Sequence, residues 1–299
     1  MRRYGRASRY RGGGGGGTVT PPAATPIVGP STLDAMTVGP MTVANMRAML
    51  GYTGTSYIGT GNLTNTSVAQ ATSSTPWGKS TRVFDQYLAA GTFGMPNSPA
   101  GNNGTGLALT TCPMPASSDR VAIEYDVCFL GSGRWPLGGK LPGIGGVRPG
   151  GGSVPTGGTQ SANGFSCRLM HRRDNTNPTS GFLVGYLYDP LAPTDSYGTD
   201  LDTGRQRIDW NTVYRVRQEI EMNTVTTEGS KTPPENGRHR IYWNGALVYE
   251  DTGAILRLYS DVTNSHECFD LFHGGADSSW GADNDVHVQI DNYTVEALA

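Results

Sequence analysis

Glycine and proline together fill about one position in five of this 299-residue chain, with 43 Gly and 19 Pro. Both are unfavourable inside a regular helix, Gly because it loses the most backbone freedom and Pro because it lacks an amide hydrogen. A helical bundle is therefore excluded. The glycines follow no Gly-X-Y period and hydrophobic residues make up 36% of the chain, so a collagen-like or wholly disordered chain is excluded as well.

From about Pro76 the sequence changes to short runs in which apolar and polar residues alternate, separated by Gly, Asn and Asp. Alternation with a period of two is typical of β-strands that bury one face, and the separators are turn formers. The runs are VAIEYDVCFL (121–130), GFSCRLMHR (164–172), GFLVGYLY (181–188), VYRVRQEIEM (213–222), RHRIYWNGALVYE (238–250) and DVHVQIDNYTV (285–295). They predict an all-β domain over residues 76–299, folded as an antiparallel β-sandwich or jelly roll.

Residues 1–17 form a basic arm that ends in six glycines. Tyrosines lie among its five arginines, which are Arg2, Arg3, Arg6, Arg9 and Arg11. Because Arg pairs with phosphates and Tyr stacks on bases, the arm is predicted to bind nucleic acid, an anionic surface or identical subunits. A flexible, solvated tail explains the same short charge run equally well.

Residues 18–75 are rich in Thr, Pro, Ser and Gly, which predicts a linker. The segment 36–52 differs, because it holds four methionines and the helix-compatible run ANMRAML. Two interpretations remain open for this Met-rich segment. It docks on a neighbouring subunit, or, as we favour, it forms a short helix packed on its own domain.

Cysteine spacing and hydropathy limit the options for metal and membrane. The four cysteines lie far apart without a C-x-x-C pair, which argues against a metal knuckle. A Cys112–Cys128 disulfide and free buried thiols both remain open. No apolar run approaches the length that spans a bilayer, so no membrane span is expected.

The basic N-terminus lacks the apolar run of a secretory signal. Either the signal lies outside this sequence or the protein leaves its cell by another route, such as lysis. The expected localisation is extracellular or virion-associated.

The strand period indicates which side chains share a face. In GFSCRLMHR, Ser166 and Arg168 face one way, together with Met170, and the residues between them face the other. The same rule places Tyr186 and Tyr188 on one face of their strand. Before these strands, the Gly- and Pro-bounded segment RWPLGGKLPGIGG (134–146) carries Lys140 as the only charge between its first arginine and Arg148. A lysine held by such tight backbone is expected to be positioned for a purpose.

In order along the chain, GGKLPG (138–143), F-S-x-R (165–168), Y-x-Y (186–188) and GG-x-D-x-x-W (274–280) resemble polysaccharide lyase family 14, which contains alginate and glucuronan lyases. The resemblance covers about residues 80–297 and not the first 75. It implies a concanavalin-like jelly roll that cleaves uronic-acid polymers, a class of anionic polysaccharide, by β-elimination. That reaction needs a cation for the C6 carboxylate, a base for the C5 proton and an acid for the leaving oxygen.

The resemblance assigns these tasks to side chains of the quoted motifs. Arg168 is the candidate for gripping the uronate, because its planar fork suits a carboxylate. Lys140, Tyr186 and Tyr188 are the candidate catalytic groups, and Ser166 would orient substrate or a catalytic side chain. The sequence does not divide base from acid between the lysine and the tyrosines.

Three features depart from the pattern or lie beside it. His273 stands where an aromatic residue is expected, and is either an accessory substrate contact or a hydrogen-bonded rim residue. The Gly-rich insertion 147–164 is either a mobile lid or a floppy loop. Asp277, Asp283 and Asp285 do not match an EF-hand loop, so no metal or cofactor is predicted, with a structural Ca²⁺ as the less favoured alternative.

An active lyase is the favoured function. The alternatives are a structural virion protein built on a lyase-like jelly roll, with the arm binding nucleic acid or subunits, and a catalytically idle carbohydrate-binding protein.

Overall fold

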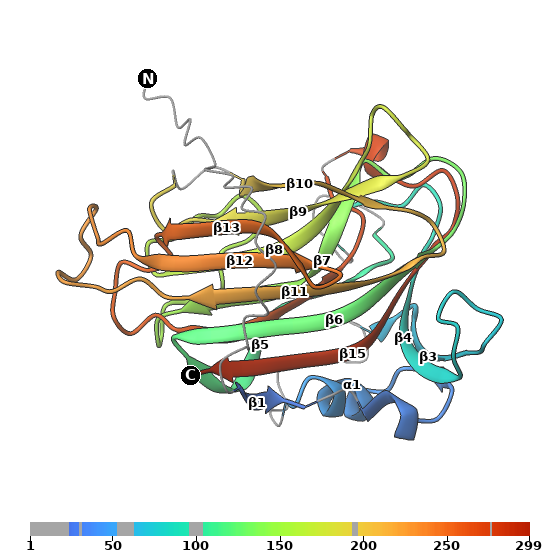
Figure 1. The fold of residues 1–299 in the computed structure, drawn as a ribbon, viewed down its shortest axis with the longest axis horizontal. Helices are drawn as coiled ribbons and strands as arrows, with labels where there is room; N and C mark the ends of the chain where they lie inside the picture. Colours follow the sequence, from blue (N-terminus) through green and yellow to red (C-terminus); the bar gives the residue numbers. More distant parts are fainter. Residues whose placement is uncertain (1–23, 30–31, 53–62, 96–103, 193–196, 276) are drawn as a thin grey trace.

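Two antiparallel β-sheets make up most of the described molecule (Figure 1). The computed structural model describes residues 24–29, 32–52, 63–95, 104–192, 197–275 and 277–299. The strands of the first sheet are β1 (Ala24–Val28), β2 (Gly39–Pro40), β3 (Thr66–Ala71), β4 (Thr81–Leu88), β6 (Arg120–Leu130), β11 (Val213–Glu221), β12 (Gly237–Trp243), β13 (Ala246–Ala254) and β15 (Val286–Leu298). Those of the second are β5 (Leu107–Ser118), β7 (Gly138–Val147), β8 (Gly164–Arg173), β9 (Gly181–Tyr188), β10 (Thr199–Ile208) and β14 (Asn264–Leu271).

Within the described residues, the nine-stranded sheet has the order β13-β12-β11-β6-β15-β4-β3-β2, with β1 paired to β15, and the six-stranded sheet has the order β10-β9-β8-β7-β14-β5. In the part of the chain that the structure describes, three short helical segments accompany them: η1 (Thr32–Ala35), α1 (Val43–Met49) and η3 (Ser278–Trp280). The predicted all-β antiparallel sandwich is confirmed.

Alternate residues of each strand fill the space between the sheets, as the sequence period requires. On β6 the fully buried residues of the main core include Val121, Ile123 and Tyr125, and on β8 they include Cys167 and Leu169. The faces of β8 and β9 that carry the motif residues therefore point away from the other sheet. The sandwich thereby presents these motif residues on the outer face of the six-stranded sheet.

One predicted run is two strands. Asn244 and Gly245 divide residues 238–250 into β12 and β13, and both have positive φ, 49° and 82°. Two consecutive residues with positive φ form the tight turn that matches the twist of a β-hairpin, and Asn-Gly is its preferred sequence.

Residues before the expected boundary at 76 belong to the same body. β3 pairs with β4, and β1 pairs with the C-terminal half of β15. Met46 and Met49 of α1 are buried in the main core together with Met36 and Met41. The Met-rich segment thus packs on its own domain, because its four methionines are buried in this core. The sheet also includes strands before residue 76.

The four cysteines are all free and buried, so Cys112 and Cys128 form no disulfide. Burial raises the pKa of the Cys128 thiol to about 12, which keeps it protonated. Among the described residues, no helix is long and apolar enough to cross a membrane. The five arginines of the basic arm lie outside the described residues.

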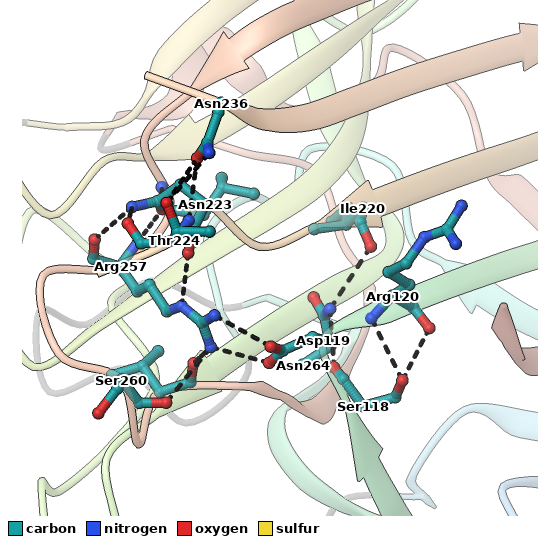
Figure 2. A network of polar contacts seen from close by, with 12 residues as sticks. Ser118, Asp119, Arg120, Ile220, Asn223, Thr224, Asn236, Arg257, Ser260 and Asn264 are labelled. Carbon is teal, nitrogen blue, oxygen red and sulfur yellow. Dashed lines mark hydrogen bonds and ion pairs between the residues drawn. The ribbon is translucent and has the colours of Figure 1, made fainter. Parts of the chain in front are cut away.

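A buried arginine ties together three connections between strands (Figure 2). Arg257 donates from Nη1 and Nη2 to the carboxylate of Asp119 at 2.8 and 3.0 Å, and from Nε to the Asn223 carbonyl at 2.7 Å. The Asn223 side chain in turn accepts from the amides of Leu256 and Arg257. Asp119 joins β5 to β6, and Arg257 lies between β13 and β14. Each of these connections passes from one sheet to the other, so the network holds two of the inter-sheet connections together.

Replacing Arg257 with alanine is expected to lower the free energy of unfolding by about 2–4 kcal/mol, because the buried carbonyls of Asn223 and Val262 lose their donor at once. Urea denaturation measures this loss. Arg148→Ala is the matched control, since Arg148 forms a similar two-pronged pair with Asp261 at the surface. An exposed pair contributes about 0–1 kcal/mol. Equal losses in both variants would contradict a stapling role for Arg257.

Candidate functional site

The motif residues of β8 and β9 meet on the outer face of the six-stranded sheet. Register pairs Arg168 with Tyr186 and Ser166 with Tyr188, so these four side chains form two adjacent rows. Met170, two residues after Arg168, packs with both tyrosines on this face. The face predicted from the strand period is the face observed.

Lys140 reaches the same face from β7. Its Nζ donates to Met170 Sδ at 2.9 Å and lies 3.4 Å from the centroid of the Tyr186 ring. Burial, reinforced by the nearby charges of Arg168 and Arg172, lowers the pKa of Lys140 well below its ordinary value of 10.5. The amine is thus able to lose its proton far more readily than a surface lysine.

The glycines of GGKLPG permit the close packing that fixes this lysine. A Cβ on Gly139 would lie 2.3 Å from Nε2 of His171, and one on Gly143 would lie 2.3 Å from the Cys167 carbonyl. Both neighbours belong to β8, which pairs with β7 along this stretch. Side chains at either position would push β7 away from β8 and displace Lys140.

The two tyrosines are buried and touch each other. Their rings meet edge to face with centroids 5.5 Å apart. Burial raises the pKa of Tyr186 above its ordinary value of 10, and the charge of Tyr188 and its hydrogen bonding with Tyr188 add to the rise. Tyr186 therefore keeps its phenol proton where Lys140 has lost its own.

Arg168 is a buried cation with donors to spare. Its side chain is 1% exposed and pairs through Nη1 with Asp270 at 2.9 Å, while the same nitrogen donates to Thr156 Oγ1 at 3.0 Å. Asp270 also accepts from Thr110, at 2.9 and 3.1 Å. Nε and Nη2 of Arg168 are buried and have no hydrogen-bond partner among the described residues. Such unpartnered charged donors are costly, and a carboxylate would satisfy both.

The Gly-rich insertion lies directly on these residues. Ser166 Oγ donates to the Pro155 carbonyl at 2.6 Å, and the Gly158 amide donates to the Tyr188 phenol oxygen at 3.2 Å. Val154 anchors the loop, since it is buried against Val147 and Cys268. The insertion is therefore a cover over the site, and its mobility stays a prediction.

His273 is not brought to this face. It forms a bridge with Gly139 on the side where His171 lies, and its ring is 6.3 Å from the His171 ring. His171 itself accepts from Trp135 Nε1 and contacts Phe129 in the core between the sheets. Burial lowers the pKa of His273 to about 4. His273 therefore does not reach substrate on the outer face, because it lies two residues after the inward-facing Leu271 and continues the same alternation beyond the end of β14.

Sequence reasoning missed two charged residues of the site. Arg172 continues the alternation of Ser166, Arg168 and Met170, so the period itself would have placed it on the outer face. Asp270, which pairs with Arg168, comes from a different strand in an otherwise apolar stretch, and nothing in its local sequence indicates that partner.

The acidic cluster near the C-terminus has structural partners. Asp277 caps η3 by accepting from the Ser279 amide at 2.9 Å, and Asp285 accepts from the Ala90 amide at 2.9 Å. Over the described ranges, no group of three or more His, Cys, Asp or Glu side chains is arranged to hold a metal ion.

Comparison with known proteins gives one family and several similar structures. A family model described as Polysaccharide lyase 14 matches residues 78–293. The alginate lyase from Aplysia kurodai is 20% identical with a TM-score of 0.62, covering 93% of this chain and 100% of that one. Alginate lyase Aly36B is 19% identical with a TM-score of 0.62, covering 92% and 97%. Alginate lyase vAL-1 from Chlorella virus is 15% identical with a TM-score of 0.61, covering 79% and 90%. A search of curated proteins found no match.

Proposed function

Since the chain belongs to the polysaccharide lyase 14 family and is a polysaccharide lyase, we propose that it cleaves uronate polymers such as alginate by β-elimination on the outer face of the six-stranded sheet. The observation that carries this proposal is the buried, unpartnered pair of donors on Arg168 beside Lys140 and Tyr186. Similarity of fold to alginate lyases supports the choice of alginate as the first substrate to test.

Arg168 binds the C6 carboxylate of the reacting sugar through Nε and Nη2. Asp270 holds the other side of the guanidinium, so the fork is oriented before substrate arrives. Neutralising the carboxylate makes the C5 proton beside it more acidic, because charge that develops on the carboxylate during proton removal is stabilised. This is the first of the three tasks that β-elimination requires.

Lys140 is the base and Tyr186 the acid. The lowered pKa of Lys140 supplies a neutral amine, and the raised pKa of Tyr186 supplies a phenol that still holds its proton. Lys140 Nζ takes the C5 proton, the electron pair of that C–H bond forms the C4–C5 double bond, and the C4–O bond breaks. Tyr186 then gives its proton to the departing glycosidic oxygen. Every task falls to a side chain, so the proposal includes no cofactor.

Ser166 and Tyr188 take positioning roles in this scheme. Both are held by the Gly-rich insertion, through Pro155 and Gly158. Thr156 of the same segment accepts a hydrogen bond from Nη1 of Arg168. Because Nε and Nη2 of Arg168 are buried in this arrangement, we expect residues 155–158 to shift when the polymer carboxylate binds. We therefore do not propose that the protein only binds carbohydrate without cleaving it.

The substrate class is tested with a matched pair of polymers. Alginate, polymannuronate, polyguluronate and glucuronan are each compared with the same polymer after chemical reduction of its carboxylates to alcohols. We expect ultraviolet absorbance of the unsaturated product to grow on at least one uronate polymer, and at least about 100-fold more slowly on its neutral counterpart. Folded protein that is silent on every uronate polymer, or that depolymerises both forms equally, would contradict the proposal.

Binding of nucleic acid or of identical subunits by the basic arm, and a place in a virion or outside the cell, stay predictions from sequence. The residues of the basic arm lie outside the described part of the chain.

A further inference from the structure

Beyond Lys140 and Tyr186, the outer face continues with a cation and an indole. Arg172 follows Arg168 by four residues on β8, so it shares its face. Its guanidinium carbon lies 5.7 Å from the centroid of the Tyr186 ring and 5.5 Å from that of the Trp280 ring. One permanent positive charge therefore stands between the proposed acid and an aromatic platform.

The GG-x-D-x-x-W segment fixes the position of this indole. Gly275 has a φ of +96°, and a Cβ built on it would lie 1.9 Å from Cγ of Trp280, so any side chain there would displace the ring. Gly274 also faces the indole, with its Cβ position 3.6 Å from the ring. Asp277 caps the short turn that leads to Trp280. The segment thus holds a partly exposed indole in a set place.

Arg172 is held by a partner that a substrate carboxylate can replace. Nε and Nη2 contact the Asp200 carboxylate at 3.0 and 2.7 Å. The Asp200 side chain is 45% exposed, whereas Asp270, the partner of Arg168, is fully buried. An exposed pair of this kind is weak, so exchanging one carboxylate for another costs little.

We infer that Trp280 and Arg172 form a second uronate subsite beside the reacting sugar, where the indole stacks on the sugar ring and the guanidinium binds its carboxylate. This inference rests on the proposed function, because it takes the polymer to be a polyuronate. A flat apolar ring face suits an aromatic platform, and a planar fork suits a carboxylate. The subsite gives the enzyme a grip on the neighbouring sugar that does not depend on the catalytic groups.

The test separates binding from cleavage by using the Lys140→Ala protein. Calorimetric titration measures its affinity for alginate and glucuronan oligosaccharides from disaccharide to hexasaccharide, each also in carboxyl-reduced form. In this background we expect Trp280→Ala and Arg172→Gln each to weaken hexasaccharide binding about 10-fold. Trp280→Phe is expected to restore most of the affinity. On the carboxyl-reduced hexasaccharide, Trp280→Ala still weakens binding and Arg172→Gln has no effect.

Arg215→Gln is the matched control. Arg215 lies on β11 in the other sheet and forks through Nε and Nη2 onto Asp126 at 2.8 and 3.0 Å, the same kind of pair as Arg172–Asp200. It is expected to leave oligosaccharide affinity unchanged.

The outcomes separate failure of the subsite from failure of the substrate class. Hexasaccharide affinity that is unaffected by Trp280→Ala and by Arg172→Gln would overturn the subsite. If Arg172 acts only by lowering the pKa of Lys140, Arg172→Gln shifts the pH profile of the active enzyme but leaves oligosaccharide binding in the Lys140→Ala background unchanged. That result would also overturn the subsite. Lys140→Ala protein that binds neither alginate nor glucuronan oligosaccharides would instead contradict the proposed substrate class.

Discussion

Replacing Lys140 with alanine is expected to lower kcat on the preferred uronate polymer by about 1,000-fold, the effect of losing a positioned general base. No other amine is placed to substitute among the described residues of the site. Because Arg168 still binds the carboxylate, KM is expected to change far less than kcat. The growth of absorbance from the unsaturated product measures both constants.

The pH profile identifies the base independently. Lys140 acts when it is deprotonated, so kcat/KM rises with pH through its lowered pKa, well below the 10.5 of an ordinary lysine. Tyr186 acts when it is protonated, and its raised pKa keeps it so across that range. The wild-type profile therefore rises early and falls only in strong alkali. Tyr186→Phe is expected to remove the alkaline fall along with most of the activity.

Lys231→Ala is the control for these measurements, because this lysine is exposed in the connection between β11 and β12. It is expected to keep wild-type kcat and the wild-type profile. A Lys140→Ala protein that is folded and retains activity within about 10-fold of wild type would show that another group removes the C5 proton.

The outer face of the site was predictable because strand alternation is a local property. Ser166, Arg168 and the two tyrosines occupy the face that a period of two assigns to them. The same period, applied to Leu271 and His273, places the histidine inward, as the structure does. The substrate contact considered for His273 came from its position in the family motif, which does not indicate the face of the sheet on which a side chain lies.

Other parts of the site depend on contacts that no local pattern encodes. Asp270 meets Arg168 because β7 brings β14 and β8 together, and Thr156 meets it because the insertion folds back. A similar reason explains why composition did not reveal the strands before residue 76. Short strands rich in Thr and Ala, such as β3, look like linker in composition and join the sheet only through their pairing with β4.

Glu267→Gln is expected to gain free energy of unfolding relative to the wild type as pH rises, by about 4 kcal/mol between pH 5 and 9. Glu267 lies fully buried between the sheets, where Tyr293 donates to its Oε2 and Oε1 has no partner among the described residues. Burial raises the pKa of Glu267 from 4.5 to about 8, opposed only by the Tyr293 hydrogen bond. The folded protein therefore holds a neutral acid where the unfolded chain holds a carboxylate.

The sign follows from proton binding by the two states. Below about pH 4.5, Glu267 is protonated in both the folded and the unfolded state, so its burial costs the wild type no stability through ionisation. As pH rises toward 8, only the unfolded state loses the proton, so wild-type stability falls by about 1.4 kcal/mol per pH unit and then levels off. Three buried histidines with lowered pKa values, His171, His239 and His273, act oppositely below about pH 6.5, and the variant shares them.

The difference between wild type and variant therefore isolates Glu267. Urea denaturation at pH 5, 7 and 9 is expected to show Glu267→Gln gaining on wild type as pH rises, whatever constant cost its unpartnered amide adds. Glu250→Gln, which alters a partly exposed glutamate of β13, is expected to follow the wild-type slope. If the stability of Glu267→Gln and that of the wild type depend on pH in the same way, Glu267 is ionised in the folded protein as it is in the unfolded chain. That result would contradict the raised pKa of the buried carboxyl.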